Sequence, residues 1–116
     1  MNIKMIVTDL DGTLLRKDKT ISDYTKSVFN KCHENGFLIV FATARPERAT
    51  RQWQTGNSSC CYVIANNGAT ITHGGNVVQN ILIPENIKHN VIAQFMADKN
   101  ITGICVETNV NRLRKK

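Results

Sequence analysis

Two aspartates separated by one residue, Asp9 and Asp11, are the side chains of this sequence best suited to chemistry. They lie in the segment DLDGT, residues 9–13, where Leu10 is expected to turn inward and Gly12 permits a tight loop. One oxygen of Asp9 can contact a magnesium ion while the other faces phosphorus, because magnesium prefers oxygen ligands and accepts few from protein. Asp11 is placed to protonate a leaving oxygen and then to deprotonate water. Two carboxylates at this spacing are not specific alone, but their place in a tight loop after an apolar segment favours phosphoryl transfer. The alternative is a turn with two exposed aspartates.

Apolar runs before and after these aspartates predict a parallel sheet. Three short, mostly apolar segments have the composition of strands that are buried on both faces. With a helix between each pair, their order is one half of a doubly wound, Rossmann-like parallel sheet, which is an α/β fold. The strands are expected at residues 3–7, 37–42 and 62–65.

Two helices are predicted between these strands. Ser22 is suited to cap a helix over residues 23–35, which ends at Gly36. Pro46 opens a second, short helix that reaches about Gln54. The apolar face of the first helix is expected to comprise Tyr24, Val28, Phe29 and Cys32.

Polar residues follow each of the three predicted strands. Asp9 and Asp11 follow the first, Thr43 the second, and Asn66 and Asn67 the third. Ligands of doubly wound sheets bind outside the carboxyl ends of the strands. We therefore expect these side chains to converge on one site. An alternative for Thr43 is that it caps the helix that follows.

Residues 69–116 follow a different pattern. A hairpin, a helix and a last strand replace the alternation of parallel strands and helices. This change predicts a boundary near Gly68, with residues 1–68 in a core domain and residues 69–116 in an appended α+β domain that ends in a basic tail. The expected elements are a hairpin at residues 69–79, a helix at 85–99 and a strand at 101–107.

The net charge of +6 is concentrated at the end of the sequence. Four of the fifteen Lys and Arg residues lie among the last five residues, and the remaining eleven stand against nine acids. A nucleic-acid-binding protein more often spreads its basic residues along a groove, with aromatic residues between them. We therefore expect a solvated tail and no nucleic-acid partner.

The cysteine pattern indicates neither a zinc site nor a disulfide framework. The four cysteines form no CxxC pair, and the three histidines complete no zinc-ligand spacing. The longest uninterrupted apolar run, residues 37–42, is too short to cross a membrane, and no basic segment followed by an apolar stretch indicates a signal peptide. We expect reduced thiols, a cytoplasmic location and no membrane partner.

The polar motifs resemble those of the haloacid dehalogenase (HAD) superfamily of phosphohydrolases over essentially the whole chain. The first motif of that superfamily corresponds to DLDGTLL, residues 9–15. The resemblance implies that Asp9 is the nucleophile, which forms an aspartyl phosphate, and that Asp11 is the general acid and base. Asp9 and the carbonyl of Asp11 would bind the magnesium ion. The second motif is a Ser or Thr that ends the second strand, and here Thr43 would donate a hydrogen bond to a phosphate oxygen.

Finer features are similar to the Cof-like branch of this superfamily. Residues 42–46 read ATARP where that branch has a sequence close to ATGRP, and residues 67–69 read NGA. The resemblance implies a cap inserted after the third strand and a small phosphorylated metabolite, such as a sugar phosphate, as substrate. Arg45 would supply a cation for the phosphate or the cap, although a solvent-facing arginine is the alternative. The residues assigned to the phosphate or the substrate are Leu10, Thr43, Arg45 and Asn67.

Two further motifs of the superfamily, a lysine and an acidic pair, have no match in this sequence. The acids after Asn67 are isolated from one another: Glu85, Asp98 and Glu107. We therefore expect a truncated N-terminal half that is inactive or nearly inactive alone. Its first strand would form an unprotected apolar edge, which favours self-association or pairing with a complementary fragment.

Two other functions remain open. One is a non-catalytic remnant that binds magnesium or a phosphorylated ligand, or that pairs with another chain. The other is a response-regulator receiver domain, which also has an acidic pair after its first strand. A receiver domain needs a phosphoacceptor aspartate at the end of the third strand, where this sequence has residues 65–67, Ala-Asn-Asn.

Overall fold

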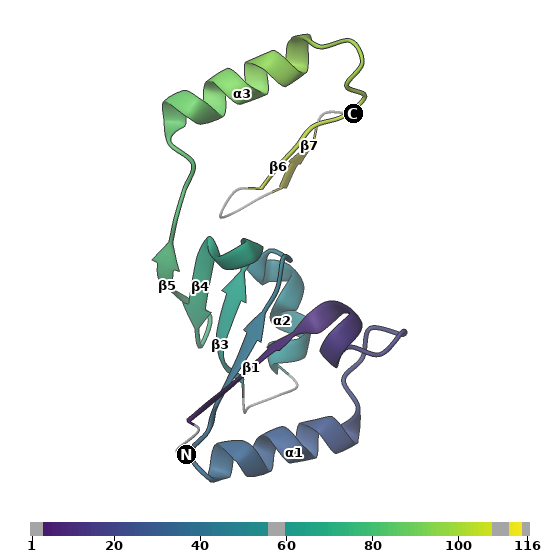
Figure 1. Ribbon diagram of the computed structural model, residues 1–116, viewed down its shortest axis with the longest axis vertical. Helices are drawn as coiled ribbons and strands as arrows, with labels where there is room; N and C mark the ends of the chain where they lie inside the picture. The colour runs from purple at the N-terminus through teal and green to yellow at the C-terminus, as the bar shows by residue number, and fades with distance from the viewer. Residues whose placement is uncertain (1–3, 56–59, 108–111, 115–116) are drawn as a thin grey trace. The chain divides into compact units, whose positions relative to one another are not determined.

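The computed structural model describes residues 4–55, 60–107 and 112–114 (Figure 1). The chain divides into two compact units, Met1–Ile81 and Leu82–Lys116, which are described separately below. The break between them falls later than the predicted domain boundary near Gly68, because the hairpin after Gly68 pairs with the sheet of the first unit. The position of the boundary between functional domains, near Gly68, stays a prediction.

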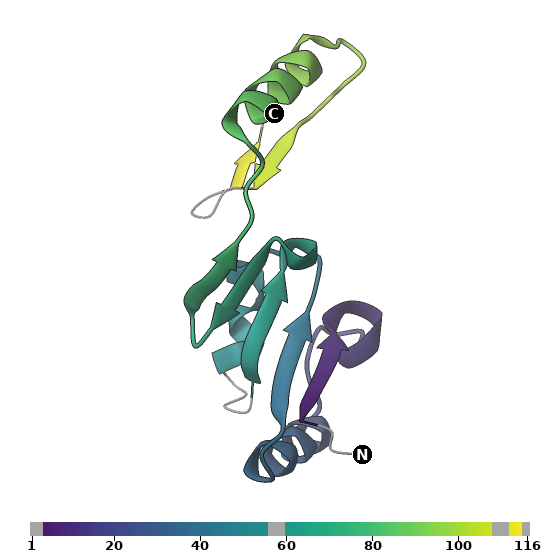
Figure 2. The same cartoon turned by 60° about the vertical axis from the view of Figure 1, so that its left-hand side comes forward.

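The first unit is built on a five-stranded sheet with the strand order β1-β2-β3-β4-β5 (Figure 2). The first three strands are parallel, as predicted, and the last two form an antiparallel hairpin that extends the sheet. The predicted α/β fold is confirmed. The strands are β1 (Met5–Asp9), β2 (Leu38–Ala42), β3 (Cys60–Ala65), β4 (Thr70–His73) and β5 (Asn76–Asn80).

Two helices, α1 (Asp23–Glu34) and α2 (Glu47–Thr55), belong to the same hydrophobic core. Phe29 of α1 and Trp53 of α2 are buried in one cluster with Ile39 and Phe41 of β2. Because side chains alternate between the two faces of a strand, Ile39 and Phe41 show which face of the sheet these helices cover. The core thus lies on one face of the sheet.

The opposite face of the sheet is only partly covered. Met5 and Val7 of β1 are 49% and 53% exposed, and Leu38 of β2 is also exposed. The prediction that these strands are buried on both faces is therefore wrong for β1 within the described residues. An apolar groove of about 260 Å³ runs across this face. It is lined by Met5, Leu38, Val40, Tyr62, Ile64 and Ile71.

Helix α1 begins and ends where the sequence predicts. The Ser22 hydroxyl accepts a hydrogen bond from the Thr25 N–H at 3.1 Å, which satisfies a backbone donor of the first turn. Gly36, with a φ of +82°, follows the last turn in the left-handed conformation that suits glycine. The predicted apolar face is correct for the buried Phe29 and wrong for Tyr24 and Val28, which are exposed. Tyr24 lies in the first turn of the helix.

We expect Ser22→Ala to lower the free energy of unfolding of the first unit by about 1 kcal/mol, because the Thr25 N–H loses its acceptor. Urea denaturation followed by circular dichroism measures the change. Ser27→Ala is the matched control, since Ser27 is exposed inside the same helix and alanine is the better helix former there. An equal loss in both variants would contradict the capping role of Ser22.

The second unit contains α3 (Glu85–Ala97) and a small antiparallel pair, β6 (Cys105–Glu107) and β7 (Arg112–Arg114). The helix agrees with the prediction for residues 85–99. The strand predicted at 101–107 is shorter in the structure, and β7 was not predicted. No residue of α3 is buried. Within the described ranges, the chain has no helix with the length and apolar character needed to cross a membrane.

Candidate active site

The DLDGT segment forms a closed loop directly after β1. The Leu15 N–H donates to the Leu10 carbonyl at 2.8 Å, and Gly12 has a φ of +78°, which a residue with a Cβ adopts only with strain. Leu10 is fully buried in the core cluster, as the sequence predicts. The loop is therefore anchored by Leu10, with Asp9 and Asp11 on either side of the anchor.

A cavity of about 300 Å³ lies at the carboxyl ends of the first three strands. Asp9 pairs with Ala42 in the sheet register, and Ala42 pairs with Ile64, so these positions reach the same level. The cavity brings together three of the predicted site residues, Asp9, Thr43 and Asn67, and Asp11 and Arg45 do not line it. Its lining residues are Asp9, Ala42, Thr43, Ala44, Ile64, Asn67 and Gly68.

Thr43 is buried, and its surroundings define how its hydroxyl can act. Its Oγ1 accepts a hydrogen bond from the Arg45 N–H at 3.1 Å, which closes a small turn before α2 begins. Thr43 thus stabilises the loop rather than capping α2, the alternative considered from the sequence. The hydroxyl hydrogen is not used in this bond, so Thr43 can donate it to a ligand in the cavity.

The loops after β2 and β3 are held together by backbone hydrogen bonds. The Asn67 N–H donates to the Thr43 carbonyl at 3.2 Å, and the Asn66 N–H donates to the Arg45 carbonyl at 3.0 Å. Asn66 and Asn67 both have positive φ values, 50° and 55°, which asparagine tolerates better than most residues. The two loops therefore form one rim of the cavity.

Asp11 does not line the cavity and forms a charge cluster with two cations. Its Oδ1 accepts from the Arg45 Nη2 and from the Lys19 Nζ, each at 2.8 Å, and its Oδ2 accepts from the Arg45 Nε. The hydrogen bonds from Arg45 first, and from Lys19 second, hold the pKa of Asp11 well below its ordinary value. The two hydrogen bonds from the Arg45 guanidinium to the Asp11 carboxylate form a fork. This fork excludes the alternative that Arg45 only faces solvent.

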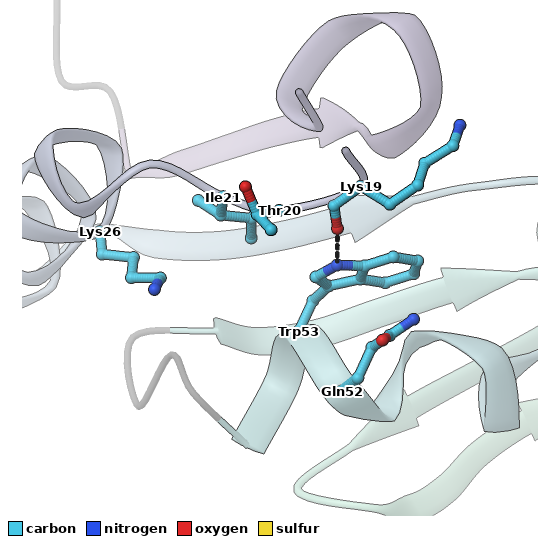
Figure 3. Close-up of a pocket in the computed structure, with 6 residues that line it drawn as sticks. All are labelled: Lys19, Thr20, Ile21, Lys26, Gln52 and Trp53. Carbon is cyan, nitrogen blue, oxygen red and sulfur yellow. Dashed lines mark hydrogen bonds between the residues drawn. The ribbon is translucent and has the colours of Figure 1, made fainter. Parts of the chain in front are cut away.

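Two residues of this cluster, Lys19 and Trp53, were not predicted. The Trp53 ring centroid lies 5.2 Å from the Arg45 Cζ, and the Trp53 Nε1–H donates to the Lys19 carbonyl at 2.8 Å. Figure 3 shows the indole pointing from α2 toward the loop that contains Lys19, while the Lys19 ammonium extends away from the ring. The one sequence signal was the presence of a single tryptophan in an otherwise polar helix.

We expect the titration midpoint of Asp11 to lie below its ordinary value and to rise in Arg45→Gln. A lowered native pKa adds stability above the pKa of the unfolded chain, about 3.9, and this stability is lost as the pH falls through the native pKa. Carboxyl-carbon NMR in magnesium-free buffer measures the midpoint. Arg51→Gln, which removes the partner of Glu47 instead, is the control. An unchanged midpoint in Arg45→Gln would show that the fork does not set this pKa.

The oxygen atoms that Asp9 and Asp11 offer are of the type that a magnesium ion prefers as ligands. Asp9 offers a carboxylate at the cavity, and the backbone carbonyl of Asp11 is an oxygen donor in the next turn. The Asp11 carboxylate is already occupied by Arg45 and Lys19, so the carbonyl is the donor that remains. Within residues 4–55, 60–107 and 112–114, no group of three or more His, Cys, Asp and Glu side chains could hold a metal.

Comparisons with known proteins identify the family. The sequence matches the haloacid dehalogenase-like hydrolase family over residues 6–114. Among curated proteins, it is 33% identical over 69 residues to 5-amino-6-(5-phospho-D-ribitylamino)uracil phosphatase YitU of Bacillus subtilis, covering 60% of this chain and 26% of that protein. It is 32% identical to a putative phosphatase of Buchnera aphidicola subsp. Schizaphis graminum, covering 94% of this chain and 38% of the other.

Solved structures show the same fold. The HAD phosphatase BT1666 of Bacteroides thetaiotaomicron superposes with a TM-score of 0.79 at 27% identity, over 98% of this chain and 42% of that chain. The HAD subclass IIB sugar phosphatase BT4131 gives 0.74 at 28% identity, over 94% and 42%. The chain thus spans about two fifths of these solved chains and less of the curated relatives. The resemblance predicted from the motifs is confirmed, and the chain belongs to the haloacid dehalogenase-like hydrolase family.

Proposed function

We propose that this chain carries the nucleophile side of a magnesium-dependent phosphomonoester hydrolase that acts through an aspartyl phosphate. The observation that carries the proposal is the cavity at the strand ends, which Asp9 and Thr43 both line. Membership of the HAD family and the names of the curated relatives support the reaction class. The finer assignments below are proposals on the same basis.

Each residue of the site has a distinct proposed role. Asp9 attacks phosphorus while the bond from phosphorus to the ester oxygen breaks, and Asp11 protonates that leaving oxygen. Asp11 then deprotonates the water that hydrolyses the aspartyl phosphate and frees Asp9. Thr43 donates its hydroxyl hydrogen to a phosphate oxygen. Asn67 and the buried Leu10 shape the loops that border the phosphate. A bound magnesium ion supplies positive charge against the phosphate oxygens.

Asp11 and Arg45 are proposed to change partners when the phosphate binds. A general acid must carry a proton, whereas the fork from Arg45 and the bond from Lys19 hold Asp11 ionised. A phosphate dianion competes with the carboxylate for the Arg45 guanidinium, because both are bidentate acceptors. We therefore expect phosphate binding to draw Arg45 away from Asp11 and so permit Asp11 to take up a proton.

The proposed substrate is a small phosphorylated metabolite such as a sugar phosphate. Two named relatives support this class: YitU is a phosphatase of a phosphorylated ribityl compound, and BT4131 is a sugar phosphatase. We also propose a cytoplasmic location, on the basis of the cysteine pattern of the sequence. The predicted absence of a nucleic-acid partner stays a prediction.

The function is tested by following p-nitrophenyl phosphate hydrolysis for hours at high chain concentration, with magnesium or with a chelator. We expect slow release that depends on magnesium, because this sequence has no match for the lysine and the acidic pair of the superfamily. Release that is equal in the chelator would overturn the proposal. A rate typical of whole phosphatases would contradict the expected need for the unmatched motifs.

A second candidate function is pairing with another chain, including a second copy. Within the described residues β1 is an edge of the sheet, and it carries the exposed Met5 and Val7 beside the apolar groove. An unprotected apolar edge of this kind favours association. Sedimentation velocity tests it: we expect concentration-dependent self-association that Val7→Lys weakens and that Val91→Lys, in α3 of the second unit, leaves unchanged. A monomer at all concentrations would contradict self-association.

A further inference from the structure

We infer that Trp53 is a positioning residue of the candidate active site. Its indole contacts Arg45 with the ring face and Lys19 with the ring nitrogen, and these two residues hold the Asp11 carboxylate. One buried side chain thereby contacts both residues that supply the cations of the cluster. The inference rests on the proposed function only for the assignment of Asp11 and Arg45 to the phosphate site.

The contact between Trp53 and Arg45 has the geometry of a cation–π interaction. The guanidinium carbon lies 5.2 Å from the ring centroid, within the range of about 6 Å over which the ring attracts a cation. Trp53 is only 6% exposed, so the ring is held in place by the core cluster. Arg45 lies in a loop, and its long side chain gains a fixed direction from this rigid partner.

The second contact acts on the turn that presents Lys19. The Lys19 N–H donates to the Arg16 carbonyl and the Arg16 N–H donates to the Thr20 carbonyl, each at 2.9 Å, so the chain reverses direction here. Lys19 has a φ of 64°, a left-handed conformation that is unfavourable for lysine. The hydrogen bond from Trp53 Nε1 to the Lys19 carbonyl (Figure 3) supports this conformation. In the same conformation the Lys19 ammonium bonds to Asp11.

A purely structural role would account for the burial of Trp53 and for the hydrogen bond of its N–H, because a buried indole N–H needs an acceptor. It would not account for the Arg45 guanidinium over the face of the ring. A decisive experiment must therefore change the electrostatics of the ring while keeping its volume. Fluorination does this, because it weakens the negative face of the ring, and the sequence contains a single tryptophan.

The experiment replaces Trp53 in the full chain with mono-, di- and trifluorotryptophan and measures solvent exchange of the Arg45 Nε–H by NMR. The signal is assigned by its loss in Arg45→Lys. We expect exchange to rise about two- to fivefold across the series, the size of an exposed cation–π contact. The Arg51 Nε–H, which bonds to Glu47 in the same helix, is the internal control and should not change. A flat series, or an equal rise at Arg51, would overturn the inference.

Trp53→Phe tests the second contact, since it keeps an aromatic ring and removes the N–H. We expect faster exchange of the Lys19 amide in Trp53→Phe than in the wild type. The Arg45 Nε–H should be more protected from exchange in Trp53→Phe than in Trp53→Leu. Equal protection of Arg45 in these two variants would count against the ring contact.

Neither readout requires turnover. Hydrolysis that is equal in the chelator, with a responsive Arg45, would refute the proposed function alone. Magnesium-dependent hydrolysis with an unresponsive Arg45 would refute this inference alone.

Discussion

Asp9→Asn is expected to reduce magnesium-dependent phosphate release from p-nitrophenyl phosphate by about 10³-fold or more, to the rate of buffer. Asparagine keeps the size of the side chain and removes the charge, so the variant loses the nucleophile without leaving a hole. Asp9 lies at the end of β1 in the cavity, and its backbone remains paired with Ala42 in the sheet. The measurement is the slow hydrolysis assay described above, with both proteins purified identically.

Asp23→Asn is the matched control for Asp9→Asn. It makes the same change at an exposed carboxylate in the first turn of α1, which pairs with Lys26 on the surface. We expect this variant to hydrolyse the substrate at the wild-type rate. If Asp9→Asn retained that rate as well, the release would come from another site or another protein, and Asp9 would not be the nucleophile.

The convergence of Asp9, Thr43 and Asn67 could be predicted because it depends on topology alone. Parallel strands bring their carboxyl ends to one edge of the sheet, and each of these residues follows or ends an apolar run that is easy to recognise. The N-cap at Ser22 was predictable for a similar reason, since its acceptor role depends on residues three positions away. Their chemical roles stay predictions.

The charge cluster could not be predicted, because it depends on the directions of long side chains. Arg45 is 34 positions from Asp11 in the sequence, and Trp53 is equally far from Lys19. Neither separation follows the helical or strand periodicity by which a sequence pattern shows that two residues are neighbours. The prediction that Tyr24 faces the core was wrong for a different reason. Helical spacing predicts which residues share a face, but it does not show where that face leaves the core near the end of a helix.

Leu10→Ala is expected to destabilise the first unit by about 2–5 kcal/mol, the range for truncating a fully buried leucine. Leu10 is 0% exposed in the core cluster and lies between the two aspartates of the loop. Since a small domain has a total stability of about 5–15 kcal/mol, this loss would unfold a considerable fraction of molecules near physiological temperature. Urea denaturation followed by fluorescence measures it, because the single tryptophan reports on the first unit.

Leu82→Ala gives the same truncation at a side chain that is 66% exposed and outside the first unit, so we expect a change within about 0.5 kcal/mol. The effect of Leu10→Ala should also reach the charge cluster at low denaturant. Asp11 is the next residue in the chain, and a loosened loop weakens its fork with Arg45, which raises the titration midpoint of Asp11. A destabilised variant with an unchanged midpoint would show that the fork, together with Trp53, holds Asp11 without help from the Leu10 anchor.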